Sequence, residues 1–278
     1  MIKIENTEVF GLESAIRGMR NPLNSWDKSD SHKSWDGKFC IGEADLKLMK
    51  SLVKAGSDHS KFMRMINVTF DITAPLYWWK EFDTYKIGTV RNSCSTMHKI
   101  AEKEFTIDDF SYEHLINMYE EEMLYSENAL YCCDSIDSLE QIIAVLNAHR
   151  SNYLNTKNKK YWWQMIQLLP SSYNQRATIQ LNYAVLRNIY HSRKNHKLDE
   201  WREFCKWIET LPYSELITST KQKAKWLKAD DEICYSEKCS ACGWQGRVCR
   251  CGKDFCDIEE TKNFCPNCGA EMEVQKDD

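Results

Sequence analysis

Residues 77–98 carry a dense mixture of polar and aromatic side chains. An ordinary surface helix keeps its polar side chains on one solvated face. Here they are interleaved with aromatic residues, so some of them must point inward, where buried polar groups need partners. This pattern is typical of a pocket for a flat, anionic ligand. The polar members are Lys80, Glu81, Lys86, Arg91, Asn92, Ser95 and His98, and the aromatic ones are Trp78, Trp79, Phe82 and Tyr85.

A cluster of cysteines near the C-terminus could bind a metal. Eight of the 13 cysteines lie between positions 234 and 268, and in a reducing compartment such clustering favours metal over disulfides. Two Cys-x-x-Cys pairs, each followed by glycine, predict a structural zinc ribbon, whose closed site leaves no position for a substrate. The predicted ligands are Cys239, Cys242, Cys265 and Cys268. The remaining cysteines of this cluster are Cys234, Cys249, Cys251 and Cys256. They could form a second metal site, replace one of the two pairs as ligands, or stay free. A single zinc site with the other thiols unbound is favoured.

The charge of this cysteine module argues against nucleic acid as its partner. Residues 229–278 contain 6 Lys/Arg and 12 Asp/Glu, a net charge of −6, and the whole chain has a net charge of −4. A phosphate-binding face requires the opposite sign. The module is therefore expected to stabilise the chain or to dock a protein.

The length and composition predict a globular chain of two parts. With 278 residues, the chain is expected to form a large domain over residues 1–228 and a zinc-ribbon module over residues 229–278. The N-terminus lacks the apolar core of a signal peptide, and no apolar run approaches the roughly 18 residues of a membrane span. A cytoplasmic protein without a membrane anchor is predicted.

Residues 181–193 form a second polar constellation, on an expected helix. It carries Asn182, Asn188 and Arg193. An arginine near the C-terminus of a helix is most often a solvated charge that the helix dipole favours. It becomes a ligand residue only if it turns inward, where its fork suits phosphate.

Taken together, several separated segments resemble the flavin-dependent thymidylate synthase family. Residues 84–98 are similar to that family's Arg-His-Arg cluster and its Ser-x-Asn-Glu-x-Ser-x-Arg-Tyr motif, and residues 56–62 resemble its Gly-His-x-Ser-Pro-Phe-Glu-His segment. The order and spacing agree over roughly residues 1–215, and the cysteine module lies outside the family pattern. Downstream counterparts of the family's motifs are Leu169, Pro170, Arg176, Asn182, Asn188 and Arg193.

The chain departs from the family pattern mainly in its cations. Thr84, Tyr85 and Lys86 stand where the family has Arg-His-Arg, so one cation remains, and Ala184 replaces a further arginine. The family's Ser-x-Arg-Tyr becomes Ser95-Thr-Met-His, and its motif Glu becomes Ser93. Each lost charge-assisted hydrogen bond would reduce the binding free energy for phosphate or flavin by about 1.5–3 kcal/mol.

The resemblance implies a fold, an assembly and a division of roles. The fold class would be α/β (α+β). Its core of antiparallel sheet plus helices would be like that of the thymidylate synthase complementing protein. Four copies would form a homotetramer whose pockets are shared between subunits. The reaction would transfer a one-carbon unit to C5 of a dUMP-like pyrimidine deoxynucleotide, using FAD, a folate and NADPH. Glu81, Ser95 and Arg193 would hold the nucleotide, with Glu81 at the base edge, and His59, Lys86, Asn182 and Asn188 would hold the flavin.

Three hypotheses stay open at this point. The chain is a divergent nucleotide-methylating enzyme, or a non-catalytic nucleotide-binding or protein-docking protein on the same scaffold. The missing cations favour the second, whereas the polar–aromatic segment would be costly to bury with nothing to fill it. In the third, the Trp78–Trp79 and Trp162–Trp163 pairs are merely core.

Local patterns predict the elements that position these residues. A helix is expected to follow residue 45, with Asp45 as its cap and Gly56 as its stop. Pro75 is expected to open a helix that carries the polar residues up to His98. Strands are expected at residues 3–10 and 65–72, and further helices at residues 13–19, 108–124, 138–146, 161–169, 177–192 and 198–210.

Overall fold

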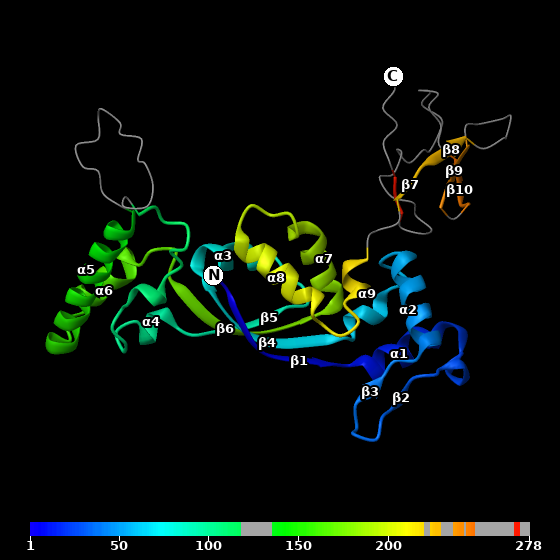
Figure 1. Ribbon diagram of the computed structural model, residues 1–278, viewed down its shortest axis with the longest axis horizontal. Coiled ribbons are helices and arrows are strands. Elements are labelled where there is room, and N and C mark those ends of the chain that lie inside the picture. The colour runs from blue at the N-terminus through cyan, green and yellow to red at the C-terminus, as the bar shows by residue number, and fades with distance from the viewer. Residues whose placement is uncertain (118–134, 220–222, 229–235, 242, 248–269, 273–278) are drawn as a thin grey trace. The chain divides into compact units, whose positions relative to one another are not determined.

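The computed structural model describes residues 1–117, 135–219, 223–228, 236–241, 243–247 and 270–272 (Figure 1). The chain divides into two compact units. Unit 1 comprises Met1–Glu8, Val68–Leu181 and Ser192–Trp207, and unit 2 comprises Val9–Asn67, Asn182–His191 and Ile208–Asp278. The predicted boundary at residue 228 adjoins residues 229–235, which lie outside the described part, so it stays a prediction.

Unit 1 is built on a four-stranded sheet. Every second side chain of its central strands is buried, including Phe70 and Ile72 on one strand and Ile179 on the next. This period of two is what a sheet with one covered face requires. The edge pair is antiparallel, with Val90 opposite Gln180. In spatial order the strands are β1 (Lys3–Phe10), β4 (Asn67–Pro75), β6 (Asn174–Asn182) and β5 (Val90–Ser93).

Helices α3 (Leu76–Phe82) and α8 (Asp199–Glu209) supply an aromatic core over this sheet. The rings of Trp78 and Trp201 lie 4.8 Å apart, and that of Phe204 lies 5.9 Å from Phe70 of β4. All four side chains are fully buried. Such large rings dominate the burial energy of a core, so the positions of α3 and α8 are tightly defined.

A second apolar cluster of unit 1 forms where α5 packs against α6 (Figure 1). Leu146 and Met165 are fully buried in it, and Phe105 packs there from the preceding loop. The remaining helices of unit 1 are α4 (Thr96–Lys99), a 3-10 helix (Ile107–Asp109), α5 (Ser135–Thr156) and α6 (Lys159–Leu168).

Unit 2 is mainly helical. Met49 of α2 and Ile189 of α7 are fully buried, and so is Leu216 of α9. Its helices are α1 (Leu12–Arg20), α2 (Glu43–Lys54), α7 (Tyr183–Arg193, whose last two residues belong to unit 1) and α9 (Glu215–Thr218), with 3-10 helices at Asn21–Leu23, Trp26–Lys28 and Lys61–Arg64. Its strands are β2 (His32–Lys33), β3 (Phe39–Cys40), β7 (Lys223–Ala224), β8 (Trp226–Lys228), β9 (Ser236–Cys239), β10 (Gln245–Arg247) and β11 (Glu271–Met272).

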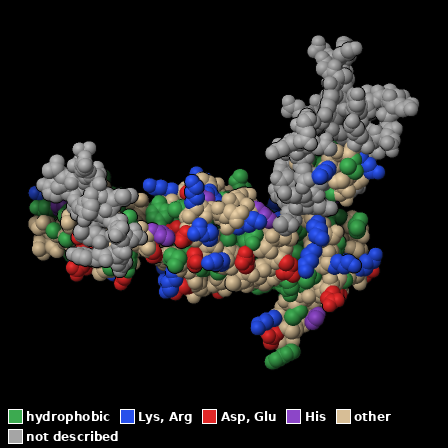
Figure 2. Space-filling model, turned by 45° about the horizontal axis from the view of Figure 1, so that its top comes forward, with side chains coloured by type: hydrophobic (Ala, Val, Ile, Leu, Met, Phe, Trp, Pro, Cys, Tyr) green, Lys and Arg blue, Asp and Glu red, His purple; other side chains and the backbone are tan. Residues whose placement is uncertain are grey.

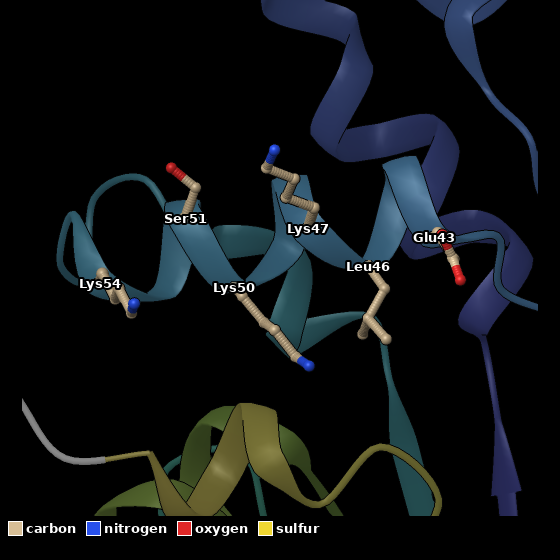
Figure 3. Close-up of a pocket in the computed structure, with 6 residues that line it drawn as sticks. All are labelled: Glu43, Leu46, Lys47, Lys50, Ser51 and Lys54. Carbon is tan, nitrogen blue, oxygen red and sulfur yellow. The ribbon is translucent and has the colours of Figure 1, made fainter.

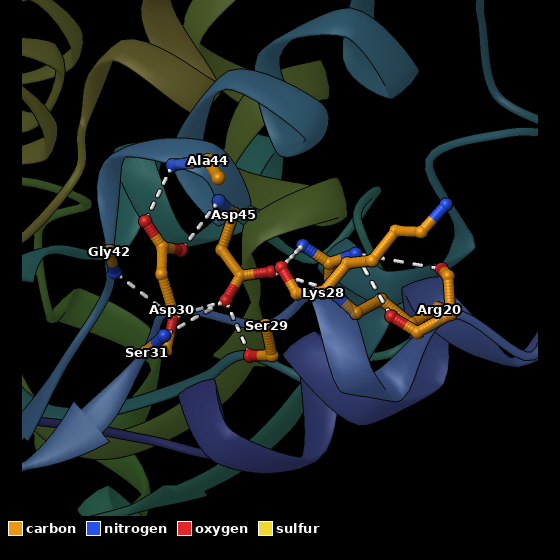
Figure 4. A network of polar contacts seen from close by, with 9 residues as sticks. Arg20, Lys28, Ser29, Asp30, Ser31, Gly42, Ala44 and Asp45 are labelled. Atoms are coloured by element: carbon orange, nitrogen blue, oxygen red, sulfur yellow. Dashed lines mark hydrogen bonds and ion pairs between the residues drawn. The ribbon is translucent and has the colours of Figure 1, made fainter.

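A buried ion pair joins α1 to α2 in unit 2 (Figure 4). Arg20 Nε donates to Asp45 Oδ1 at 2.7 Å, and the hydroxyls of Ser29 and Ser31 donate to Asp45 Oδ2 at 2.6 Å. Burial opposes the ionisation of Asp45, but the hydrogen bonds from Ser29, Ser31 and Arg20 outweigh it and lower the pKa of this carboxyl. The expected cap role of Asp45 is therefore wrong. Asp30 receives the first free N–H groups of α2, including that of Ala44 at 2.8 Å.

Several local expectations agree with the structure. The strand at residues 3–10 and the helices near residues 13–19 and 198–210 form where they are expected. The strand expected at residues 65–72 begins two residues later, at Asn67, and extends to Pro75. Gly56, the expected stop of the helix after residue 45, follows α2 with a left-handed φ of 106°.

Other local expectations are wrong. The helix after Pro75 ends at Phe82, and Arg91 and Asn92 lie on β5 because this segment pairs with β6. Residues 177–181 belong to β6, and only residues 183–193 are helical. The α-helix expected at residues 108–124 does not form over residues 108–117, where the only helical element is a 3-10 turn at Ile107–Asp109. Residues 118–124 lie outside the described part. The helix with the expected cap at Ser138 already begins at Ser135.

Acidic and basic side chains intermingle over the described part of the face in Figure 2. This matches the modest net charge of the chain. None of the described helices combines the length and the apolar character that a membrane crossing requires.

Candidate functional site

A cluster of polar side chains gathers around Glu81 in unit 1, and we name it the Glu81 cluster. Arg193 Nη1 donates to Glu81 Oε2 at 2.7 Å, and Trp201 Nε1 donates to the same oxygen at 2.9 Å. Arg193 Nε donates to the hydroxyl of Tyr85 at 2.9 Å. The Nε2 atom of His196 lies 3.5 Å from Glu81 Oε2. Two of the expected nucleotide residues, Glu81 and Arg193, are thus brought together.

The aromatic core decides where these groups lie. Glu81 is on the last turn of α3, Arg193 ends α7, and Trp201 is in the first turns of α8. The Arg193 guanidinium lies over the ring of Trp201, 4.8 Å from its centroid, and 5.7 Å from that of Tyr85. A guanidinium stacked on aromatic rings and hydrogen-bonded through its fork is held in one orientation.

The Glu81 cluster is partly open to solvent. Glu81 is 35% exposed and Arg193 19%. The donors within the described residues all point to Oε2 of Glu81. Its other oxygen, Oε1, can therefore accept a hydrogen bond from the N–H of a ligand, beside the positive charge of Arg193.

A hollow of about 250 Å³ adjoins this cluster, and we name it the Thr89 hollow. Tyr85 belongs to both, since it lines the hollow and its hydroxyl accepts a hydrogen bond from Arg193. Lys86, one of the expected flavin residues, lines the hollow and is exposed. The full lining is Phe82, Asp83, Tyr85, Lys86, Thr89 and Arg91.

Arg91 forms a rigid wall of this hollow. Its guanidinium lies 4.0 Å from the centroid of the Trp79 ring. Nη1 donates to both carboxylate oxygens of Asp83, at 2.8 and 2.9 Å, and Nη2 donates to Gln175 Oε1 at 2.6 Å. These bonds attach strand β5 to the end of α3 and to β6.

Ser95 has a structural task in this structure. Its Oγ accepts the backbone N–H of His98 at 3.1 Å and lies 2.8 Å from His98 Nδ1. Ser95 is therefore the N-cap of the short helix α4, which satisfies a backbone donor that would otherwise be unpaired.

The other expected flavin residues belong to unit 2. His59 and Asn188 are exposed, so their side chains can reach a ligand. Asn182 is the last residue of β6, and its Oδ1 accepts the backbone N–H of Val185 at 3.1 Å. Asn182 therefore caps α7, a role that follows from its place at a strand-to-helix junction.

The cysteine module is described only in part. Cys239 is buried, and its turn is closed by the N–H of Gly243, which donates to the Cys239 carbonyl at 2.9 Å. Gly243 has a left-handed φ of 75°, and β9 pairs with β10 on either side of the turn. Cys242, Cys265 and Cys268 lie outside the described residues, within which no group of three or more metal-binding side chains converges. The zinc site stays a prediction.

A second hollow, of about 480 Å³, lies along one face of α2 in unit 2 (Figure 3). Its described lining comes from this helix alone and is rich in lysine, and Lys50 pairs with Glu215 at 3.2 Å. A row of lysines on one helix face is usually a solvated surface, so this hollow is a weaker candidate than the Glu81 cluster.

Sequence reasoning missed two members of the site. His196 and Trp201 join Glu81 only through the fold, because Trp201 is 120 residues from Glu81 in sequence. Tyr85, by contrast, lies within the polar–aromatic segment that the sequence singled out. His196 and Trp201 had no such signal, since nothing in their sequence neighbourhood distinguishes them from other residues of α8 and its preceding loop.

Comparison with known proteins identifies the fold. No family model matches the sequence, and no curated protein matches it. Among solved structures, flavin-dependent thymidylate synthase ThyX from Helicobacter pylori, solved with FAD and dUMP, is 17% identical with a TM-score of 0.53. The match covers 78% of this chain and 97% of that one.

A second group of solved structures gives the same result. The UMP/dUMP methylase PolB from Streptomyces cacaoi, bound with 5-Br dUMP, is 12% identical with a TM-score of 0.50. The match covers 79% of this chain and 95% of that one. At such identities the likeness shows the fold alone, and it confirms the expected ThyX-like architecture of helices with an antiparallel sheet.

Proposed function

We propose that this chain is a ThyX-like protein that binds a pyrimidine deoxynucleotide such as dUMP at the Glu81 cluster. The observation that carries the proposal is the pairing of Glu81 with Arg193 and Trp201, at a solvent-reachable site, in a fold whose solved relatives hold dUMP or its 5-bromo analogue. Glu81 Oε1 offers an acceptor for the N3–H of uracil. The Arg193 guanidinium beside it offers a donor and a positive charge to a neighbouring carbonyl oxygen of the base.

The finer proposal is that the bound nucleotide is methylated at C5, with FAD, a folate and NADPH as cofactor and co-substrates. When bound, the flavin would supply the hydride equivalents of such a reaction. Of the residues proposed for the flavin, His59, Lys86 and Asn188 are exposed and fit a ligand role, whereas Asn182 is engaged as a helix cap. Ser95 would be limited to holding the backbone turn that opens α4.

The chain's own residues would bind and orient the base. The buried indole of Trp201 and the stacked guanidinium of Arg193 hold the Glu81 carboxylate in one rotamer, so its acceptor atom is fixed before the ligand arrives. This preorganisation favours one edge of a pyrimidine over others. We further propose that the protein is cytoplasmic and, like the family it resembles, a homotetramer.

A non-catalytic nucleotide binder is the second candidate. Two observations favour it: Lys86 is the single cation of the Thr84–Lys86 segment, and two of the expected ligand residues, Ser95 and Asn182, serve as helix caps. Such a protein would still recognise the base at Glu81 but would not bind the flavin that methylation requires.

A zinc ribbon at the C-terminus is part of the proposal. The buried Cys239 and the glycine-closed turn that follows it support a thiolate knuckle, because such turns direct backbone amides toward the sulfur. With Cys242, Cys265 and Cys268 it would make a closed site that stabilises the module or docks a protein partner.

Calorimetric titration with dUMP tests the proposed function. The unaltered chain is expected to bind dUMP, and Glu81→Gln is expected to weaken binding about tenfold or more, because it removes the negative acceptor. Glu104→Gln, at an exposed position, is the matched control and should leave the affinity unchanged. Equal dUMP affinity in Glu81→Gln and the unaltered chain would refute the role of Glu81.

An absorbance spectrum of the purified protein separates the two candidates. Flavin bands near one per chain, followed by formation of thymidylate from dUMP with a folate and NADPH, would support the enzyme. A colourless protein that binds dUMP without turnover would support the binder.

A further inference from the structure

The hollow along α2 presents a positive charge that the described part of the chain does not balance. Lys47, Lys50 and Lys54 line it, and their spacing of three and four residues puts them on one side of the helix; we name these three residues the lysine face (Figure 3). All three are exposed, and the same lining holds a single carboxylate, Glu43. Among the described residues, only Lys50 forms an ion pair, with Glu215 of α9 at 3.2 Å.

The hollow has room for a segment of polypeptide. Its volume is about 480 Å³, and its described lining comes from α2 alone. The surface of one helix is convex, so the far side of this hollow stays open to an occupant. Leu46 and the aliphatic stems of the lysines offer apolar contact, and the ammonium groups offer charge. An extended acidic segment is the occupant that such a lining favours.

The same chain contains a segment of the opposite charge. Residues 254–278 include 8 Asp/Glu and 2 Lys/Arg. This segment and α2 both belong to unit 2. The two therefore have complementary charges within one compact unit.

The path of the chain keeps this segment within reach of the lysine face. Strand β11 pairs with β7, where Glu271 lies opposite Lys223. Lys223 follows Glu215, the partner of Lys50, by eight residues, which span at most about 29 Å when fully extended. A single exposed ion pair is weak, but a tethered partner acts at a high effective concentration, so several such pairs together can hold it.

From these observations we infer that the lysine face docks the acidic segment 254–278 of the same chain. Carboxylates of the segment pair with Lys47 and Lys54, and Leu46 and the lysine stems contact its backbone. The C-terminal part is then joined to α2 by contact as well as by covalent connection. This inference does not depend on the proposed nucleotide site, because the Glu81 cluster belongs to unit 1.

Zero-length carbodiimide crosslinking of the full chain, followed by peptide mass spectrometry, tests the docking. The reagent joins a lysine to a carboxylate only where the two are in contact. Crosslinks between the lysine face and residues 254–278 are expected at low salt. Their yield should fall about fivefold or more at about 1 M salt, because screening then acts over a few ångströms. A mixture of isotope-labelled and unlabelled chains separates links within one chain from links between copies.

Reversal of the lysine face provides a second measurement. Chymotrypsin cleaves after aromatic residues, so its action does not depend on the lysines that are changed. Cleavage within residues 254–278 is expected to be about threefold faster or more in the triple variant Lys47→Glu, Lys50→Glu and Lys54→Glu. The matched control has the same change in net charge at exposed positions of unit 1: Lys157→Glu, Lys159→Glu and Lys160→Glu. Melting temperatures of all variants show whether each of them folds.

A charge swap separates docking from a general effect of the substitutions. Opposite changes in the acidic segment, added to the reversed lysine face, should restore slow cleavage and give crosslinks from the new glutamates to the new lysines. The added changes are Glu259→Lys, Glu260→Lys and Glu273→Lys.

Several results would overturn the inference. Crosslinks that join only labelled to unlabelled chains would show that the occupant is a second copy. Absence of crosslinks to the lysine face at low salt, or equal cleavage in the reversed chain and its control, would show that the segment does not dock there. Heparin binding that the reversal abolishes, without such crosslinks, would assign the face to a separate polyanion. Binding of dUMP is measured beside each variant, so a failure of the proposed function is seen independently.

Discussion

At the scale of single residues, hydrogen bonds connect the polar side chains of the Glu81 cluster into one network. Glu81 receives two donors on one oxygen, and one of these donors, Arg193, is itself held by Tyr85 and Trp201. A carboxylate and a guanidinium that are both partly withdrawn from water interact more strongly than an exposed pair. The base-reading atom and its positive neighbour are therefore positioned together, and a change in one alters the other.

Arg193→Lys tests this dependence. A lysine cannot donate to both Glu81 and Tyr85 through a planar fork, so Glu81 should lose its fixed position. Affinities for dUMP and for deoxyuridine are expected to fall by a similar factor, about tenfold, with a stability loss of about 1 kcal/mol. Calorimetry and urea unfolding provide the measurements, and Arg64→Lys at an exposed position is the control. A loss confined to dUMP would show that Arg193 holds the phosphate directly.

At the scale of elements, strands hold together through polar pairs as well as through the aromatic core. Asp71 on β4 accepts from Thr178 at 2.6 Å and from Arg176 at 2.9 Å, both on β6, and from Asn6 on β1 at 2.8 Å. Cross-strand pairs of this kind favour one register over its alternatives. Hydrogen bonds from Thr178, Asn6 and Arg176 lower the pKa of the Asp71 carboxyl to about 2.

The low pKa of Asp71 predicts how the stability depends on pH. Because the folded-state pKa lies below the ordinary value of about 3.9, Asp71 stabilises the fold above that pH and loses this contribution as the pH falls toward 2. Asp71→Asn is therefore expected to be less stable than the unaltered chain at pH 7, with a difference that shrinks between pH 4 and pH 2. Urea unfolding at several pH values checks this, with the exposed Asp58→Asn as control. A difference that is constant with pH would contradict the assignment.

At the scale of the whole molecule, the chain has a ThyX-like fold and a cluster of cysteines near its C-terminus. The solved relatives are covered over 95–97% of their own length, whereas 78–79% of this chain is covered by them. Part of this chain is thus additional to what it shares with them. Near the C-terminus, the described segments form a three-stranded sheet of β8, β9 and β10, with the buried Cys239 at the end of β9.

Zinc content tests the cysteine module. The purified chain is expected to carry about one zinc, and Cys265→Ser is expected to release it and to expose the module to proteolysis, since the metal supplies most of the folding free energy of so small a unit. Cys94→Ser, at an exposed position on the other unit, is the control. Elemental analysis and limited proteolysis provide the readout. Full retention of zinc in Cys265→Ser would show that other cysteines, such as Cys249, Cys251 or Cys256, are the ligands.

The sequence by itself determined what short-range patterns encode. The burial period of β4 and the amphipathic helices α1 and α8 were readable because each depends on neighbours a few residues away. Residues 177–181 were misassigned to a helix because a short apolar alternation is ambiguous. Pairing with β5 and β4 made that segment a strand.

The tertiary structure alone decided which polar residues meet. Glu81 and Arg193 are 112 residues apart, and Trp201 is farther still, so no local pattern could pair them. Ser95 and Asn182 cap the helices that begin beside them, each accepting the backbone N–H of the residue three positions on. The types of residue available for chemistry were therefore set by the sequence. Their partners were set by the burial of the aromatic core, which packs α3 against α8 within unit 1 because burying large rings contributes much of the stability of a core.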